Sequence, residues 1–218
     1  LSGLLILEVD DNNLTGFVEL DWFANLSNLF SLSLSFNLLT VKENSLRLDK
    51  LLYLGLDECN MTNFPFMSNQ SVLQGLSLGS NQIGGSIPSS LPTSLIFLNL
   101  MDNYLRSSIP GDVMGKLTSL NVLFLGMNWF KGEIPSSLCN ALSLNYLDIS
   151  NNSLQGSIPG CLLQNLSNME FFSLGLNYLN GSIPDTFRED CMLQAFSVGV
   201  NRFGGKIPRT LRNCKKLT

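Results

Sequence analysis

The carboxylates are the side chains of this sequence whose spacing most invites a chemical interpretation. Two carboxylates at a suitable distance can serve as acid and base in glycoside hydrolysis, or can bind a cation. The chain has no histidine, so the commonest general base and the histidine-based triads are excluded. No phosphate-binding loop and no Cys-x-x-Cys metal motif occurs. We therefore expect no enzyme, no metal site and no cofactor, and we expect solvated side chains at Glu8, Asp10, Asp11, Asp57, Glu58, Asp102 and Asp148.

These acids lie at variable positions of a sequence repeat. A twelve-residue segment closed by Ile-Pro returns along the sequence, as in SLGSNQIGGSIP (77–88) and DISNNSLQGSIP (148–159). The full frame is L-x-x-L-x-L-x-x-N-x-L-x-G-x-I-P, and its period is that of leucine-rich repeats. We expect one domain over residues 1–218 with about nine repeats, starting near 4, 29, 51, 73, 95, 120, 144, 169 and 193, and a tenth cut off at 217.

Each part of the frame has a structural role. L-x-L predicts a short strand with its leucines turned inward, and stacked coils join such strands into a parallel sheet on the concave side. The frame Asn turns the chain, and its amide can satisfy backbone groups at the bend. Cys59 takes that place in the third copy. Segments 39–50 and 61–72 lack Gly-x-Ile-Pro, so we expect an irregular convex side there. The Asn positions are Asn12, Asn37, Asn81, Asn103, Asn128, Asn152, Asn177 and Asn201.

The L-x-G-x-I-P element resembles the plant-specific class of extracellular leucine-rich repeats. Segments 54–88, 158–169, 183–193 and 207–217 resemble the plant receptor-like proteins of the Cf and Verticillium-resistance kind. The resemblance implies an α/β leucine-rich-repeat solenoid, a curved right-handed superhelix with a concave parallel sheet, a second short sheet and few helices. It also implies a plasma-membrane receptor without a kinase, which senses pathogen molecules or supports development together with a partner receptor kinase.

The charge and the apolar content of the chain disfavour some classes of partner and of location. The net charge of −4 disfavours nucleic acid as a partner, and no apolar run is long enough to span a bilayer. Signal peptide, capping segments and membrane anchor are missing, so we expect an internal piece of a longer ectodomain on the extracellular face of the plasma membrane. Two alternatives remain open: a secreted inhibitor similar to the polygalacturonase-inhibiting proteins, and the ectodomain of a hormone or peptide receptor kinase.

The frame also predicts which side chains point out from the concave face of the sheet. The fourth copy should be flat there, with Gly75, Ser77 and Gly79. Apolar side chains should gather on copies five to eight, with Gly126 leaving room above the sheet. One interpretation of such a patch is a contact surface for a peptide or protein. The other is that the rings stack along the sheet and only stabilise it. The expected contact residues are Phe97, Met101, Asp102, Tyr104, Phe124, Met127, Trp129, Tyr146, Asp148, Phe171, Leu176 and Tyr178.

Cysteines and glycosylation sequons complete the sequence evidence. Cys139 and Cys161 lie at similar depths of adjacent copies, as do Cys191 and Cys214, so these pairs are within disulfide reach. The alternative is buried free thiols, and we expect Cys59 to be free. Seven sequons favour a secreted or surface location, at Asn13, Asn25, Asn60, Asn69, Asn151, Asn165 and Asn180.

Overall fold

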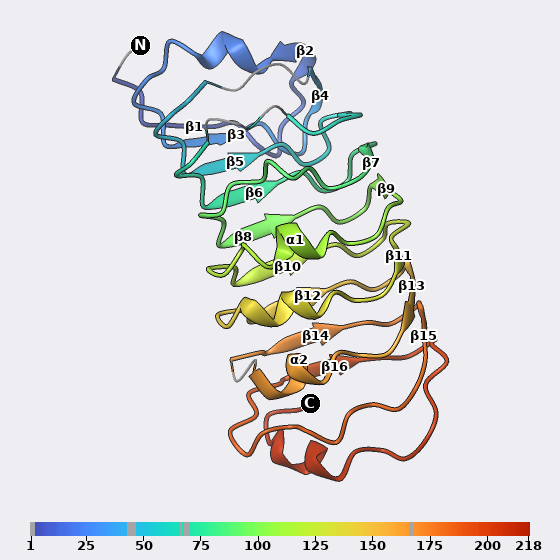
Figure 1. The fold of residues 1–218 in the computed structure, drawn as a ribbon. Coiled ribbons are helices and arrows are strands. Elements are labelled where there is room, and N and C mark those ends of the chain that lie inside the picture. The colour runs from blue at the N-terminus through green and yellow to red at the C-terminus, as the bar shows by residue number, and fades with distance from the viewer. Residues whose placement is uncertain (1–2, 43–46, 66, 68–69, 166–167) are drawn as a thin grey trace.

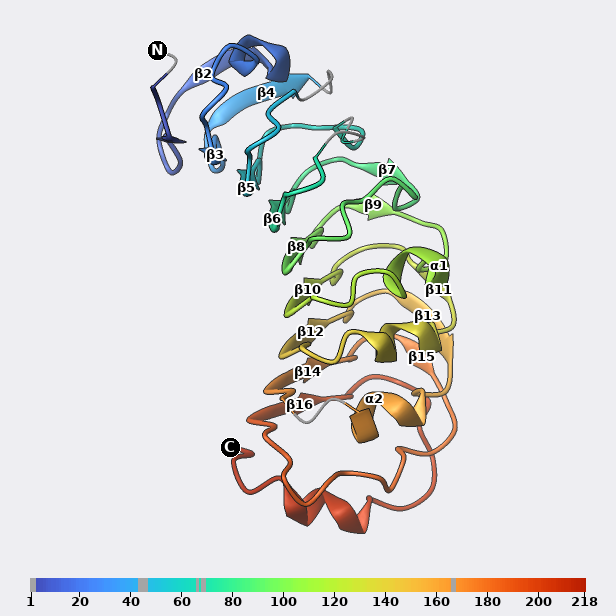
Figure 2. The same ribbon diagram turned by 60° about the vertical axis from the view of Figure 1, so that its left-hand side comes forward.

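The chain is a curved stack of coils (Figure 1). The computed structural model describes residues 3–42, 47–65, 67, 70–165 and 168–218. Coil by coil, three-residue strands join into one nine-stranded sheet, and neighbouring strands pair in parallel and in chain order. These strands are β1 (Ile6–Glu8), β3 (Ser31–Ser33), β5 (Tyr53–Gly55), β6 (Gly75–Ser77), β8 (Phe97–Asn99), β10 (Val122–Phe124), β12 (Tyr146–Asp148), β14 (Phe171–Ser173) and β16 (Ala195–Ser197). The sheet lines the concave side of the curve (Figure 2).

A second set of short strands follows the frame Asn residues and forms the lateral face. It is divided into three sheets, whose strands also pair in parallel. Between exposed positions on this face, one residue per coil points inward: Ile83, Leu105 and Phe130 are fully buried. The three sheets are β2 (Thr15–Glu19) with β4 (Leu38–Lys42), β7 (Gly84–Gly85) with β9 (Tyr104–Leu105), and β11 (Lys131–Gly132) with β13 (Ser153–Gly156) and β15 (Tyr178–Leu179).

The helical segments are short and lie on the side away from the concave sheet (Figure 2). Of the five within the described residues, four begin directly after the proline of an Ile-Pro pair, where proline stops the extended chain and presets the first turn. They are η1 (Leu20–Phe23), α1 (Gly111–Met114), η2 (Ser136–Asn140), α2 (Gly160–Asn165) and η3 (Arg209–Asn213). In the described part of the chain, no helix combines the length and apolar character that crossing a bilayer requires. The predicted fold class is confirmed.

The frame Asn amides satisfy backbone groups at the bend as predicted, and they also link neighbouring coils. The Asn128 amide donates to the carbonyls of Leu100 (2.8 Å), Leu125 (3.2 Å) and Gly126 (3.1 Å), while its Oδ1 accepts from the Leu105 N–H (3.1 Å). A buried Asn thus satisfies backbone groups of its own coil and of the preceding one. Equivalent bonds recur at Asn81, Asn103, Asn152 and Asn177.

The cysteines of the later coils form disulfides, whereas the cysteine of the third coil is free. Cys139 is bonded to Cys161 and Cys191 to Cys214, with Cα atoms 5.9 Å and 4.7 Å apart, and these are the pairs that the frame predicts. Cys59 is a buried free thiol. Its Sγ lies 3.6 Å from the Leu34 carbonyl and 3.5 Å from the Asp57 carbonyl, groups that an Asn amide contacts in other coils. Oδ1 of Asn81 accepts from both the Cys59 and the Met61 N–H groups, each at 3.0 Å.

Candidate partner-binding surface

The concave face of coils two to five carries a buried polar network centred on Asp57. This carboxylate is 6% exposed and accepts from Ser35 Oγ (3.1 Å), Ser77 Oγ (2.8 Å), Asn99 Nδ2 (3.0 Å) and the Gly79 N–H (2.7 Å). Four donors offset the cost of removing a carboxylate from water. The expectation of a solvated Asp57 was therefore wrong, because neighbouring coils deliver side chains that cover it.

The fourth coil is not bare either. Gly75, Ser77 and Gly79 are all buried. The Tyr53 ring covers Gly75, since a Cβ there would lie 2.6 Å from Tyr53 Cδ2. Burial raises the pKa of the Tyr53 phenol, and the charge of Asp57 raises it further. The surface that the frame predicts to be flat is filled by side chains from the neighbouring coils on both sides, Tyr53 and Asp57 on one and Asn99 on the other.

The other expected acids differ in their surroundings. Glu8 is exposed and accepts from Ser31 Oγ at 2.7 Å, while Glu58 and Asp102 are exposed. Asp148 is half-buried, and its Oδ1 accepts from the backbone N–H (2.8 Å) and hydroxyl (2.6 Å) of Ser150. Among residues that the structure describes, no group of histidine, cysteine or acidic side chains is arranged to hold a metal ion.

From coil five onward the concave face turns apolar. Phe97, Phe124 and Phe171 are half-buried, and Met127 is 47% exposed. The strand register divides the rings into two rows: Phe97 aligns with Val122 and, through Val122, with Tyr146 and Phe171. Phe124 lies in the other row, between Asn99 and Asp148. We define the apolar surface as Phe97, Met101, Phe124, Met127, Tyr146, Phe171 and Leu176.

Ring contacts occupy part of this surface and leave part free. Phe97 and Phe124 meet edge to face, with ring centroids 6.3 Å apart, across neighbouring strands. Tyr146 donates its hydroxyl to Glu170 at 2.9 Å, and this bond raises the pKa of the phenol. The room expected above Gly126 is taken, since a Cβ there would lie 3.1 Å from Asp148 Oδ1 and 3.3 Å from the Met101 methyl.

The residue before each frame Asn, and before Cys59 in the third coil, has a property that sequence reasoning missed. It adopts a left-handed conformation in every coil, although none of these residues is glycine. Asp102 has φ 56°, Met127 54° and Leu176 57°. All nine such residues are exposed, so the backbone presents them at the rim between the concave and lateral faces. Their fixed spacing from the Asn was the available signal. The others are Asp11, Phe36, Glu58, Ser80, Asn151 and Val200.

On the lateral face, the expected contact residues Tyr104, Trp129 and Tyr178 do not form a continuous row. Tyr104 and Trp129 lie on coils five and six and line a hollow of about 430 Å³ together with Arg106. Ser153 occupies the corresponding place on coil seven. Tyr178 lies beyond it, with the Arg202 guanidinium 4.9 Å from its ring centroid. The structure therefore brings two of the three rings together.

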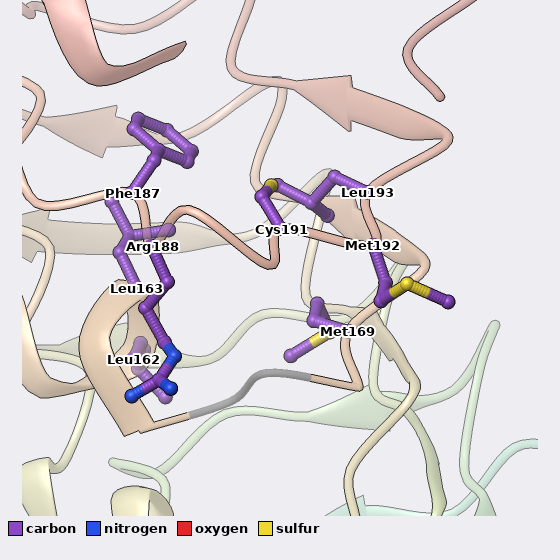
Figure 3. Close-up of a pocket in the computed structure, with 8 residues that line it drawn as sticks. All are labelled: Leu162, Leu163, Met169, Phe187, Arg188, Cys191, Met192 and Leu193. Carbon is purple, nitrogen blue, oxygen red and sulfur yellow. The ribbon is translucent and has the colours of Figure 1, made fainter. Parts of the chain in front are cut away.

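Another crevice lies on the far side of the sheet, between α2 and the Cys191 segment (Figure 3). Leu162, Leu163, Met169 and Phe187 line it. Its volume of about 10 Å³ is no larger than a single water requires, so it is a packing defect of the core and not a ligand site.

Five of the predicted sequons have exposed asparagines: Asn13, Asn25, Asn60, Asn151 and Asn180. An N-linked glycan requires such access. The Asn60 amide donates to the Leu39 carbonyl at 3.2 Å, a bond that glycan attachment would alter. Asn69 and the side chain of Asn165 lie outside the described residues.

Comparisons with known proteins agree with this architecture. The family described as Leucine Rich Repeat matches residues 72–93 and 143–165. Receptor-like protein 47 of Arabidopsis thaliana is 32% identical over 166 residues, which is 63% of this chain and 21% of that protein. The chain thus spans about a fifth of the length of this curated relative.

Solved structures resemble the whole chain. The ectodomain of the Arabidopsis receptor kinase HAESA, in complex with an extended IDA peptide hormone, has a TM-score of 0.88 at 29% identity. That likeness covers 98% of this chain and 36% of HAESA. HAESA with IDA and the co-receptor SERK1 has a TM-score of 0.74 at 27% identity over 99% of this chain and 41% of that one. The present chain is therefore a leucine-rich-repeat protein related to the plant receptor-like proteins.

Proposed function

We propose that the chain is a recognition module of a plant cell-surface receptor, which binds a peptide or protein ligand across coils five to eight. The observation that carries this proposal is the change along one continuous sheet. The concave side chains of coils two to five are bonded to each other, whereas Met127, Leu176 and Tyr146 remain exposed on the later coils. An exposed apolar patch beside a satisfied polar one is typical of a contact surface.

The ligand would cross both faces at the rim. The proposed contact residues are those of the apolar surface together with Asp102, Tyr104, Trp129, Asp148 and Tyr178. Trp129 is 64% exposed and follows Met127 by two residues, with only the buried Asn128 between them. A few residues, often Trp and Tyr, supply most of the binding energy in many interfaces, and Met is enriched at interface cores.

The related proteins suggest the setting. The HAESA structures contain a peptide hormone and, in one case, the co-receptor SERK1. We extend that arrangement to this chain: a pathogen-derived or endogenous ligand, an adaptor or co-receptor kinase, and a membrane-anchored parent protein exposed to the apoplast. The signal would serve immunity or development. The exposed sequons at Asn13, Asn25, Asn60, Asn151 and Asn180 suit an extracellular glycoprotein.

Peptide selection tests this proposal. A displayed library of random short peptides is selected on the chain, and the affinity of each enriched peptide is measured by fluorescence polarisation. Phe124→Ala combined with Trp129→Ala should weaken binding at least tenfold, since each removes an interface anchor. Trp22→Ala is the matched control, because Trp22 is 61% exposed and lies in η1, outside the proposed surface. Peptides that bind the double variant as well as the wild type would refute the proposal.

A receptor-kinase ectodomain is the second candidate, because the HAESA ectodomain matches nearly the whole chain. The sequence that follows this region in the full-length gene product decides between the two. A kinase domain would favour this candidate, and a transmembrane helix with a short tail would favour the receptor-like protein.

A further inference from the structure

Four side chains form a compact group on the lateral face of coils five and six. We call Tyr104, Arg106, Trp129 and Lys131 the lateral tile. Each coil contributes the residues one and three places after its frame Asn, so both point outward. Leu105 and Phe130, which lie between them in sequence, are fully buried and fix this orientation. All four members of the tile are exposed.

The tile borders the hollow of about 430 Å³. Tyr104, Arg106 and Trp129 line one part of it, and Thr62 and Gln82 line another. The hollow stays open at Gly84, where an added Cβ would have no neighbour closer than the Tyr104 carbonyl oxygen at 4.0 Å. A space of this size next to aromatic rings suits one or two ligand side chains.

The cations of the tile have no anionic partner within the described residues. Neither Arg106 nor Lys131 forms an ion pair there, although Lys42 on the same face pairs with Glu19 at 3.6 Å. Arg202, another cation of this face, lies over Tyr178 instead. Guanidinium, ammonium, indole N–H and phenol groups make the tile rich in donors, and a carboxylate is the complementary acceptor.

The tile continues into the apolar surface of the concave face. Met127 belongs to that surface and Trp129 to the tile, and the buried Asn128 is the single residue between them. A partner that covers Met127 therefore reaches the tile without crossing other side chains. A polysaccharide would gain little from the phenylalanine and methionine side chains next to the tile, whereas a peptide can place apolar side chains there.

Resting on the proposed function, we infer that the tile selects acidic peptides. An Asp or Glu carboxylate of the ligand lies between Arg106 and Lys131, and an adjacent apolar side chain enters the hollow beside Tyr104 and Trp129. The rest of the ligand lies across the apolar surface.

The test uses the peptides selected above and their copies in which Asp and Glu are replaced by Asn and Gln. Enriched peptides should carry an acidic residue beside an apolar one, and the neutral copies should bind about tenfold more weakly, as charge-assisted hydrogen bonds are lost. Arg106→Gln combined with Lys131→Gln should remove this difference. Lys116→Gln also removes an exposed positive charge, but after α1 and outside the tile, so this variant should keep the difference between acidic and neutral peptides. Added salt should weaken the acidic peptides more than their neutral copies.

A glycan provides a second way to block the tile. Arg106→Asn creates the sequon Asn-Ser-Ser with Ser107 and Ser108. In a glycosylating host, the attached glycan should abolish the preference for acidic peptides, and endoglycosidase treatment of the same variant separates this effect from loss of the charge.

The outcomes distinguish the two proposals. Peptides that depend on Phe124 but bind equally well in acidic and neutral form overturn the tile and leave the proposed function intact. Binding of galacturonic acid oligomers through Arg106 and Lys131, without any acidic peptide, also overturns it. A selection that enriches no peptide overturns both.

Discussion

The two halves of the concave face share one backbone geometry but carry different side chains, polar in coils two to five and apolar in coils five to eight. In coils two to five, Asp57 gathers donors from three neighbouring coils, and small residues such as Gly79 make room for them. In coils five to eight, rings and methionines occupy the same strand positions and few of them have polar partners. The polar side chains of the first half are therefore hydrogen-bonded to one another, while the second half keeps exposed apolar side chains that a partner could contact. This difference, and not the repeat, locates the candidate surface.

Removing the centre of the polar network should have the largest effect. Asp57→Ala leaves Ser35, Ser77 and the Gly79 N–H without their acceptor in a buried place, at a cost of about 3 kcal/mol in unfolding free energy. Urea denaturation measures it. Asp148 lies on the same concave face but is half-buried, so Asp148→Ala should lower the unfolding free energy by less than about 1 kcal/mol. Equal costs for the two variants would contradict the contrast between the halves.

The disulfides should stabilise only the later coils. Replacing Cys139 and Cys161 by Ser opens a link between residues 22 positions apart, and loop-closure entropy predicts a loss of about 3 kcal/mol. Hydrogen exchange should rise around η2 and α2 while the Asp57 region stays protected. Cys59→Ser is the control, since that thiol is not in a disulfide. Uniformly faster exchange along the chain would mean that the solenoid unfolds as one unit.

Glycines two places before the frame Asn test how crowded each half is. A Cβ at Gly79 would lie 2.7 Å from both Asp57 Oδ1 and Asn99 Nδ2, so Gly79→Ala should cost about 2 kcal/mol. Gly199 holds the same place in coil nine and has no atom within 4 Å of such a Cβ. Gly199→Ala should therefore change the unfolding free energy by less than about 0.5 kcal/mol. Similar costs at both positions would show that the backbone, and not the network, requires glycine.

Alkaline pH should loosen the first half through Cys59. Burial, followed by the charge of Asp57, raises the pKa of this thiol to about 12. Because the folded pKa lies above the ordinary value of 9.0, the stability that the neutral thiol provides is complete below pH 9 and is lost as the pH rises toward 12. The loss at pH 10 should be about 1 kcal/mol.

The comparison of wild type with Cys59→Ala isolates this effect. Denaturation midpoints at pH 8 and pH 10 should differ less in the variant. An identical pH dependence of the two proteins would show that folding does not raise the pKa of the Cys59 thiol.

The sequence by itself determined the coils, the inward leucines and the Asn ladder, and it placed the paired cysteines within disulfide reach, because each depends on spacing within one frame that recurs along the chain. It also placed Met127 and Trp129 outside that frame. Only the tertiary structure decided that Asp57 is buried, that Tyr53 covers Gly75 and that Asp148 fills the space over Gly126. These features depend on side chains from different coils, whose reach and direction no single repeat specifies. The frame fixes the backbone position of each side chain, and packing between coils decides its conformation and contacts.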